Sequence, residues 1–274
     1  MKGKPFFDRM YGRALAWRWM LSRSKGHFGF ELGLAASGLL DIARFFVSPR
    51  NHPMPIVYVS GVVHIRTSLG DFRFFTRRAT DDVYSCLPSR EMDVEETIKN
   101  LLRKGDTFVD VGANVGYYSV LAGRAVGPSG RVIAVEPIPE TAAVLRRNLH
   151  LNDVTGVVRQ EACWSVHTTV SLAAPPGAYG LASSVRMFNT PALSAPAAPL
   201  DDICQDLSTI RLIKIDVEGA EREVLLGARE VLTKTENLVV EVSGRTDEIR
   251  AFLEQASFRV RALKFKPYLW ASRG

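Results

Sequence analysis

The stretch Asp110-Val-Gly-Ala-Asn-Val-Gly-Tyr-Tyr-Ser119 lies between a predicted buried strand, 107–111, and a predicted helix, 115–126. Gly112 allows the chain to turn where a Cβ would collide, and Gly116 allows the helix to begin close to the strand. In a doubly wound sheet such a loop lies at the carboxyl ends of the strands, where ligands bind. The stretch therefore indicates a ligand-binding loop, and a plain tight turn is the alternative.

Strand and helix patterns alternate on the carboxyl side of this loop. Strands are expected at 131–136, 157–162, 168–173, 211–216, 237–243 and 258–263, and helices at 139–151, 220–232 and 247–255. This alternation predicts an α/β fold with a doubly wound, mostly parallel sheet. Five of the fourteen prolines fall between Pro175 and Pro199, which predicts a long irregular loop, a type of segment that is often a functional lid.

The N-terminal third has a different pattern. Apolar spacing predicts amphipathic helices over 5–25 and about 30–46, short β-strands over 56–76, and a helix over 93–102. We therefore expect an N-terminal helical and short β-strand extension, residues 1–88, followed by the sheet domain, residues 89–274.

Composition narrows the class of protein. The 274 residues are 46% hydrophobic and 23% charged, which excludes disordered and fibrous classes. The net charge of +6 is concentrated at the ends, since residues 1–30 carry seven Lys/Arg against one Asp, and residues 259–274 carry five basic residues and no acid. The body is mildly acidic, so nucleic-acid binding is not predicted.

Cysteine content and hydropathy bear on the compartment. The three cysteines, Cys86, Cys163 and Cys204, form no CxxC pair, so neither a zinc site nor a disulfide framework is predicted. We expect no membrane-spanning segment and no signal peptide, and hence a cytoplasmic protein.

Two acidic residues around the loop indicate which ligand it holds. The glycine spacing is GxxxG, and Asp110 would repel the two phosphates of a dinucleotide. Glu136 follows Gly112 by twenty-four residues, at the end of the next strand, where an acid can accept hydrogen bonds from a ribose diol. A ribose and a positive charge without pyrophosphate describe S-adenosylmethionine. A nicotinamide-dependent oxidoreductase, or a membrane- or nucleic-acid-binding module using the basic termini, is the alternative.

The motifs resemble the FkbM family of methyltransferases over about residues 90–263. They are 110–119, Val135-Glu-Pro-Ile-Pro-Glu140, Asn148 with Asn152, Leu200-Asp-Asp202 and Ile213-Lys-Ile-Asp-Val-Glu-Gly-Ala-Glu221. The resemblance implies a class I (Rossmann-like) fold and O-methylation of a sugar or other small natural product. It implies cofactor contacts from Asp110, Gly112, Asn114, Gly116, Tyr117, Glu136, Pro137, Ala162, Trp164 and Asp216. One departure is the turn at Trp164 and Ser165, where the family often has an acid, and Trp164 could stack on the adenine instead or be a core residue.

Candidate catalytic residues follow the fourth strand. Lys214, Asp216 and Glu218 alternate with apolar residues, which predicts that all three project to one face, and Glu241 closes the next strand at the same edge. A positioned base among them would remove a hydroxyl proton, whereas a buried Lys–Asp pair is the structural alternative. Asp216 and Glu218 could hold Mg²⁺, but two ligands without a neighbouring His predict no metal.

Other polar residues of the sequence are weaker candidates for the same site. His167 is a possible base but more often such a residue is a surface histidine, and His64 is expected to be structural. Ser183 and Ser184 fall in the predicted lid.

Partners are predicted mainly from the N-terminal helix. It carries Trp17, Trp19 and the basic residues, so it could lie in an anionic membrane interface through residues 1–27. Packing on the sheet domain or on a second subunit, giving a homo-oligomer, is the favoured alternative. The substrate partner is expected to be a small-molecule hydroxyl acceptor.

Overall fold

A computed structural model describes residues 6–47, 54–67, 69–88, 90–185, 188, 190–264 and 267–273. It divides the chain into two compact units. The first comprises Met1–Pro88 and Pro175–Gly180, and the second Ser89–Ala174 and Leu181–Gly274. Each unit is described by itself.

The second unit is built on a seven-stranded sheet in the order β12-β13-β11-β10-β4-β5-β6. Its strands are β4 (Thr107–Val111), β5 (Arg131–Val135), β6 (Gly156–Arg159), β10 (Ile210–Ile215), β11 (Thr235–Glu241), β12 (Arg259–Ala262) and β13 (Tyr268–Ser272). β13 runs antiparallel to both its neighbours, and the pairs from β11 to β6 are parallel. The predicted doubly wound, mostly parallel α/β sheet is confirmed.

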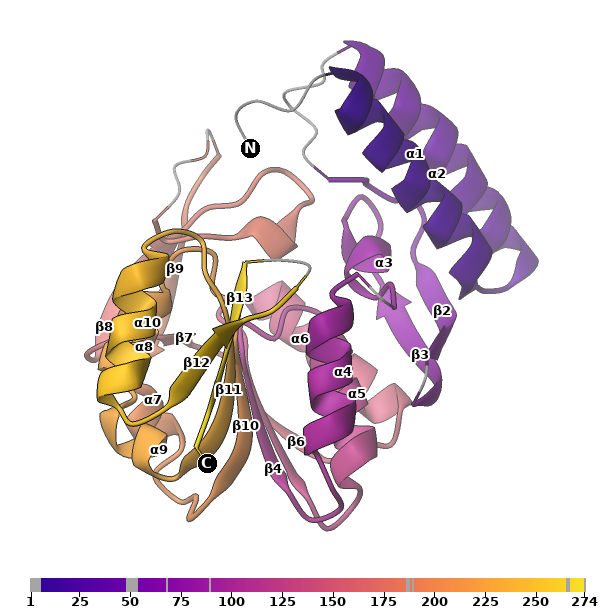
Figure 1. The fold of residues 1–274 in the computed structure, drawn as a ribbon. Helices are drawn as coiled ribbons and strands as arrows, with labels where there is room; N and C mark the ends of the chain where they lie inside the picture. Colours follow the sequence, from indigo (N-terminus) through magenta and orange to yellow (C-terminus); the bar gives the residue numbers. More distant parts are fainter. Residues whose placement is uncertain are drawn as a thin grey trace. The chain divides into compact units, whose positions relative to one another are not determined.

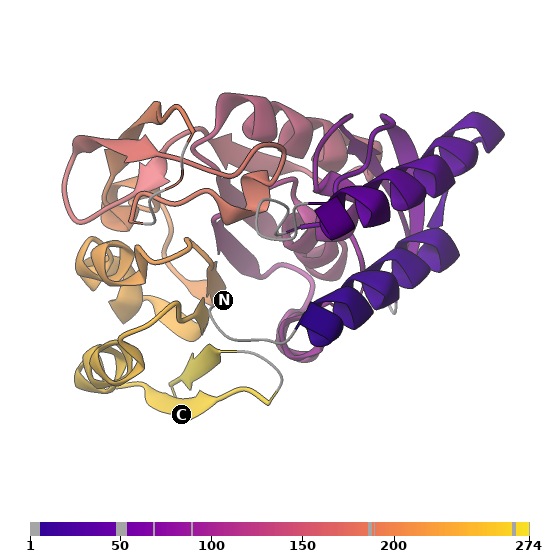
Figure 2. The ribbon, with the colours of Figure 1, turned by 90° about the horizontal axis from the view of Figure 1, so that it is seen from above.

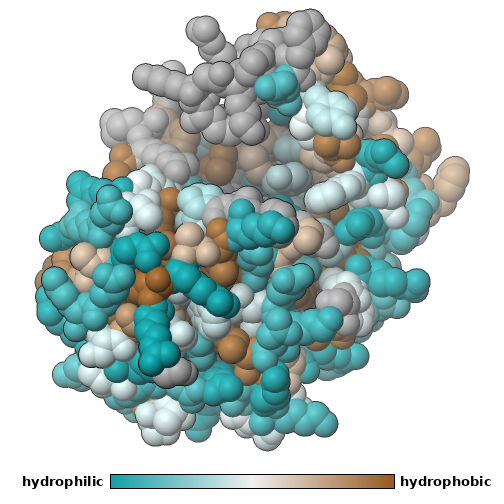
Figure 3. Space-filling model, in the orientation of Figure 1, coloured by the Kyte–Doolittle hydropathy of each residue, from teal (hydrophilic) through white to brown (hydrophobic). Residues whose placement is uncertain are grey.

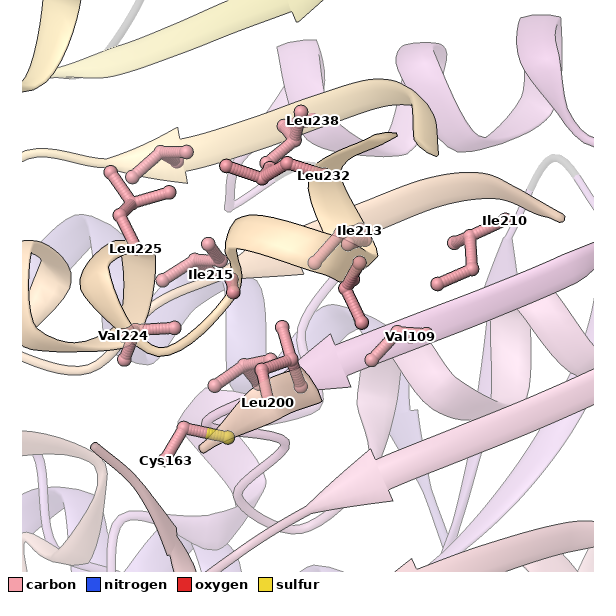
Figure 4. Packing of buried hydrophobic residues seen from close by; sticks show 14 of the residues in the cluster. Val109, Cys163, Leu200, Ile210, Ile213, Ile215, Val224, Leu225, Leu232 and Leu238 are labelled. Carbon is pink, nitrogen blue, oxygen red and sulfur yellow. The ribbon is translucent and has the colours of Figure 1, made fainter. Parts of the chain in front are cut away.

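Helices cover both faces of this sheet (Figure 1). One face carries α4 (Met92–Leu101), α5 (Tyr117–Val126) and α6 (Pro139–Leu151), and the other carries α7 (Leu200–Ile203), α8 (Glu221–Leu226), α9 (Arg229–Thr233) and α10 (Thr246–Gln255). Figure 4 shows the core on the second face, where Ile213, Ile215 and Leu238 of the sheet lie near Val224 and Leu225 of α8. This packing holds the carboxyl ends of β10 and β11 in place.

The sequence prediction was wrong for three segments of this unit. β8 (Thr168–Leu172) is not part of the main sheet but forms a small sheet, β7-β9-β8, with β7 (Ala162–Cys163) and β9 (Leu193–Ala198). β9 lies within the stretch predicted to be irregular. It was missed because its buried side chains are small alanines rather than large apolar residues. The prediction also missed β13, which contributes Tyr268 to the interior.

The first unit matches its predicted elements closely. It contains α1 (Phe6–Arg23), α2 (Phe28–Val47), the antiparallel sheet of β1 (Ser24–Lys25), β2 (Gly61–Thr67) and β3 (Gly70–Thr76), and α3 (Asp82–Ser85). Residues 56–59, expected to be a strand, form only the isolated bridge between Val57 and Thr80. Residues 1–5, at the start of the predicted helix, lie outside the described residues.

A buried ion pair holds α1 and α2 side by side (Figure 2). The Asp41 carboxylate accepts two hydrogen bonds of 2.6 Å from the Arg13 guanidinium and one of 2.6 Å from Nε1 of Trp17. Arg13 also donates to the carbonyl of Met54 at 2.8 Å. Both charged groups are therefore paired and hydrogen-bonded, the condition under which charges are tolerated in a protein interior.

Replacing Asp41 by Ala should destabilise the first unit by about 3 kcal/mol, because the Arg13 charge would stay buried without its partner. Urea unfolding measures this loss. Asp8→Ala, at an exposed position of α1, is the matched control and should change the free energy of unfolding by less than about 0.5 kcal/mol. Equal stability of the two variants would show that the Arg13–Asp41 pair does not hold the helices together.

Candidate functional site

The loop after β4 is shaped by three residues with positive φ: Gly112 (78°), Asn114 (49°) and Gly116 (91°). The amides of Gly112 and Ala113 both donate to the carbonyl of Val135 at 3.0 Å. A Cβ on Gly112 would lie 1.9 Å from the carbonyl oxygen of Asp216. The absence of a side chain thus lets the loop lie directly against the end of β10, and any substitution at Gly112 would disturb both segments.

Glu136 joins this loop to the loop after β5. Its Oε2 accepts a hydrogen bond from the amide of Asn114 at 2.9 Å, and its Oε1 accepts one from the amide of Ile138 at 3.0 Å. A carboxylate has about four acceptor positions, so Glu136 can hold the two loops and still accept hydrogen bonds from a ribose. Its predicted role stays a prediction that the geometry permits.

Asp110 lies beneath the loop, in the interior. Its side chain is fully buried, and its Oδ2 accepts a hydrogen bond of 2.6 Å from the hydroxyl of Ser119. Its Oδ1 is buried without a hydrogen-bond partner, 3.8 Å from Nζ of Lys214. Burial raises the pKa of Asp110, although the Lys214 charge opposes this shift. One acceptor atom under the loop is therefore left for a donor.

Lys214 lies beside Asp110 across neighbouring strands and is the central charge of the site. Its side chain is 2% exposed, and its Nζ lies 3.0 Å from Oδ2 of Asp216 and 5.0 Å from the centre of the Tyr118 ring. Burial by itself would lower the pKa of Lys214, but the carboxylates of Asp216 and Asp110 outweigh it and raise that pKa. Lys214 is therefore charged at neutral pH.

Asp216 and Glu241 form a hydrogen-bonded carboxyl pair with very different proton affinities. Burial would raise the pKa of Asp216, but the Lys214 ammonium and the hydrogen bond with Glu241 hold it well below its usual range. Burial, together with the Asp216 charge, raises the pKa of Glu241 to about 10. At neutral pH the pair thus holds one proton, on Glu241, and one negative charge, on Asp216.

The extended chain predicted from Lys214 through Glu218 is not present, because β10 ends at Ile215. Glu218 has a left-handed φ of 53°, and its carbonyl accepts a hydrogen bond of 2.7 Å from Ser183. Carboxylate oxygens of Asp216, Glu218 and Glu241 nevertheless lie within 4.8 Å of one another, a spacing that a cation could use. Lys214 supplies one positive charge to this group of carboxylates, through its contact with Asp216.

Four residues outside the predicted site complete this region. The Tyr118 hydroxyl donates to Glu91 at 2.5 Å, and Arg90 lies 3.1 Å from the same carboxylate. Tyr268 is paired with Glu241 across β13 and β11, and its hydroxyl is buried without a hydrogen-bond partner. Burial, and to a lesser extent the charge of Asp216, raises the pKa of Tyr268 well above its ordinary value. The Tyr268 hydroxyl is therefore neutral and can donate a hydrogen bond near the acids. Only the missed strand β13 could have signalled it.

The remaining predicted cofactor residues have structural contacts of their own. The Tyr117 hydroxyl donates to Glu95 at 2.9 Å. Trp164 and Ala162 pack against the apolar side chains of the small β7-β9-β8 sheet, the arrangement expected of core residues. Pro137 is half-buried beside Glu136. Contacts of these residues with a cofactor stay predictions.

Both histidines considered in the sequence lie on exposed positions. Nε2 of His167 is 2.6 Å from the Asp202 carboxylate, and the His167 side chain is 72% exposed. His64 is an exposed residue of β2. Ser184, in the predicted lid, is half-buried. The structure favours a surface role for both histidines.

Comparisons with known proteins agree with the sequence motifs. Residues 110–260 match the family model described as the methyltransferase FkbM domain, and residues 53–164 match the one described as the Vibrio cholerae RfbT protein. The chain is 31% identical over 191 residues to the methyltransferase sdnD of Sordaria araneosa, covering 56% of this chain and 73% of that protein. It is 28% identical over 181 residues to the 2-O-methyltransferase NoeI of Sinorhizobium fredii, covering 57% and 71%.

Comparison with solved structures gives matches of low sequence identity. An S-adenosylmethionine-dependent O-methyltransferase of Thermotoga maritima is 16% identical, with a TM-score of 0.42 and 77% of each chain covered. An O-methyltransferase of Bacillus cereus, solved with S-adenosylhomocysteine, is 14% identical with a TM-score of 0.41, covering 66% of this chain and 79% of that one.

The Glu241 proton predicts how stability depends on pH. The folded protein retains this proton up to about pH 10, whereas the unfolded chain loses it near the ordinary pKa of 4.5. Its contribution to the free energy of unfolding is therefore fully present below pH 4.5 and declines as pH rises toward about 10. The decline is at most about 1.4 kcal/mol per pH unit.

Glu241→Gln keeps a neutral hydrogen-bond donor, so this variant should lose less stability than the wild type between about pH 6 and pH 9. Urea unfolding across this range measures the slope. Glu254→Gln, on the exposed side of α10, is the control and should follow the wild type. If Glu241→Gln has the wild-type slope, Glu241 does not carry a proton at neutral pH.

Proposed function

Since the chain belongs to the FkbM family of methyltransferases and uses S-adenosylmethionine as its methyl donor, we propose that it methylates a hydroxyl oxygen of a small acceptor, a sugar or another natural product. Membership of this family excludes the alternative function, a nicotinamide-dependent oxidoreductase. The observation that carries the proposal is the cluster of Asp216 and Glu241 carboxyl groups beside Lys214, where the end of β10 contacts the Gly112 loop.

The residues of the loop fit this cofactor. Asp110 Oδ1 is a buried acceptor without a hydrogen-bond partner, which suits the amino group of a methionine. Glu136 has acceptor positions for the ribose hydroxyls. When bound, S-adenosylmethionine supplies a methyl group on a positively charged sulfur. Unlike a dinucleotide, it carries no phosphates that Asp110 would repel.

Asp216 is the group that we expect to receive the hydroxyl proton of the acceptor. An alcohol oxygen becomes strongly acidic as it gains a methyl group, so a carboxylate with a low pKa is a sufficient base. Lys214, 3.0 Å away, keeps Asp216 ionised before transfer. Glu241, holding its own proton, orients Asp216 through their hydrogen bond.

The 2-O-methyltransferase name of one relative supports oxygen as the methylated atom. The Tyr268 hydroxyl, buried near Glu241 and without a partner, offers a donor to a second oxygen of the acceptor. A polyhydroxylated acceptor such as a sugar would use both a carboxylate and a donor. The direct test incubates the protein with methyl-labelled S-adenosylmethionine and a panel of monosaccharides, phenols, amines and thiols, and identifies the labelled products by mass spectrometry. Labelled amine or thioether products, and no ethers, would contradict the proposal.

Glu136→Ala should weaken S-adenosylmethionine binding by about 10–100-fold, because hydrogen bonds to a charged acceptor are lost. Isothermal titration calorimetry measures the change. Glu140→Ala, at an exposed position in the first turn of α6, should bind like the wild type. Unchanged binding by Glu136→Ala would remove Glu136 from the cofactor site.

Asp216→Asn should reduce turnover by about 10²–10⁴-fold while S-adenosylmethionine affinity changes by less than about threefold, since the carboxylate acts on the acceptor. Glu218→Gln should also reduce turnover more than affinity. Circular dichroism checks that the Asp216→Asn variant is folded, since Lys214 then has Asp110 as its remaining carboxylate partner. A folded Asp216→Asn protein that turns over normally would refute Asp216 as the base, even if the cofactor site is correct.

A further inference from the structure

The solvent-facing side of α2 is apolar. Phe28, Leu32 and Leu39 are 83%, 62% and 76% exposed, and Leu40 and Val47 beside them are also exposed. The first three are four and seven residues apart, which places them along one face of the helix. Among the exposed positions of α2, Arg44 is the charged one. A helix in contact with water normally presents polar residues there.

The interior of the first unit does not need this face. α2 already buries Phe30, Leu34 and Phe45 on its other side. The charges of the Arg13–Asp41 pair are also on the inside. The α1–α2 hairpin therefore has an apolar interior that includes one ion pair, and it still exposes large apolar side chains on α2. Figure 3 shows hydrophobic surface gathered over these helices, at the upper right.

The exposed charges of α1, β1 and α2 are mainly basic. Arg18, Arg23, Lys25 and Arg44 are exposed, against the single exposed acid Asp8, among the residues described between 6 and 47. Trp19 is partly exposed, and the Arg23 guanidinium lies 5.3 Å from the centre of its ring. Tryptophan with flanking Arg and Lys is the composition of surfaces that lie at the boundary between lipid and water.

We propose that the outer face of α2, with the neighbouring basic and Trp19 side chains of α1 and β1, docks on the surface of an anionic lipid bilayer. The apolar side chains would enter the acyl boundary, and the basic side chains would meet the negative headgroups. The hairpin would lie along the surface, because none of the helices in the described ranges is long and apolar enough to span a bilayer.

Charge distinguishes a bilayer from a second copy of the chain. A two-fold interface brings the same patch of both subunits together. Here that would place Arg18, Arg23 and Lys25 near their own counterparts, with Asp8 as the exposed acid on α1 to compensate. An anionic membrane supplies the complementary charge that a second copy lacks. This proposal does not depend on the identity of the methyl acceptor.

Flotation with vesicles tests the proposal on the full-length protein. Binding is expected to vesicles of phosphatidylcholine with phosphatidylglycerol, to be weaker with phosphatidylcholine alone, and to fall with added salt. Leu32→Gln/Leu39→Gln should reduce the bound fraction by at least about tenfold. Val157→Gln/Val166→Gln, at two similarly exposed apolar positions of the second unit, is the matched control and should bind like the wild type.

A second measurement on the wild-type protein keeps the test decisive if the double variant does not fold. Brominated lipids should quench the fluorescence of wild-type Trp19, and the lipid-induced quenching should be absent in Trp19→Phe. The proposal is overturned if the wild type does not bind anionic vesicles or if folded Leu32→Gln/Leu39→Gln binds like the wild type. It is also overturned if the wild type is a dimer that this double variant makes monomeric, since a second copy would then cover the face.

Discussion

The Lys214 ammonium, buried between two carboxylates, is the interaction on which the site depends. It lies 3.0 Å from Asp216 and 3.8 Å from Asp110, on adjacent parallel strands. An unpaired charge at this depth would cost several kcal/mol, so the three groups are tolerated only together. The pairing ties the strand that enters the cofactor loop to the strand that carries the candidate base.

The position of Lys214 and Asp216 also affects the neighbouring loop and the protonation of Glu241. Gly112 lies against the carbonyl of Asp216, so the loop and the end of β10 must keep their positions together. Lys214 keeps Asp216 ionised, and the Asp216 charge in turn keeps Glu241 protonated. A single positive charge thus sets the protonation of both acids that face the proposed acceptor.

The first unit uses a buried ion pair in a different way. Arg13 and Asp41 join α1 to α2 from within, so the hairpin does not need an apolar stripe on every contact surface. Large apolar side chains can then be placed on the outer face of α2, at a cost in solubility that a lipid surface would remove. The chain therefore has two separate features. The second unit carries the proposed methyl-transfer site, and the α1–α2 hairpin carries the proposed contact with a membrane.

Local patterns in the sequence were sufficient for most elements and for the tight loop after β4. The Gly112–Gly116 spacing, Asp110 and Glu136 are determined by backbone geometry and charge within a short stretch, so they were recognisable without a structure. Alternation of strand and helix patterns predicted the parallel sheet, and helical spacing of apolar residues predicted both N-terminal helices. Neither pattern revealed two of the strands. These are β9, whose alanines bury little surface, and β13, which is recognised only by its pairing with β11 and β12.

The acidic site, by contrast, was decided by the tertiary structure. The sequence placed Lys214, Asp216 and Glu218 on one face by assuming that the strand continues, but the chain leaves the strand after Ile215. Tyr118 and Tyr268 come from α5 and β13, far apart in sequence, and reach the acids only through the fold. Proton affinity depends on burial and on charges within a few ångströms, and neither quantity exists until distant segments pack together.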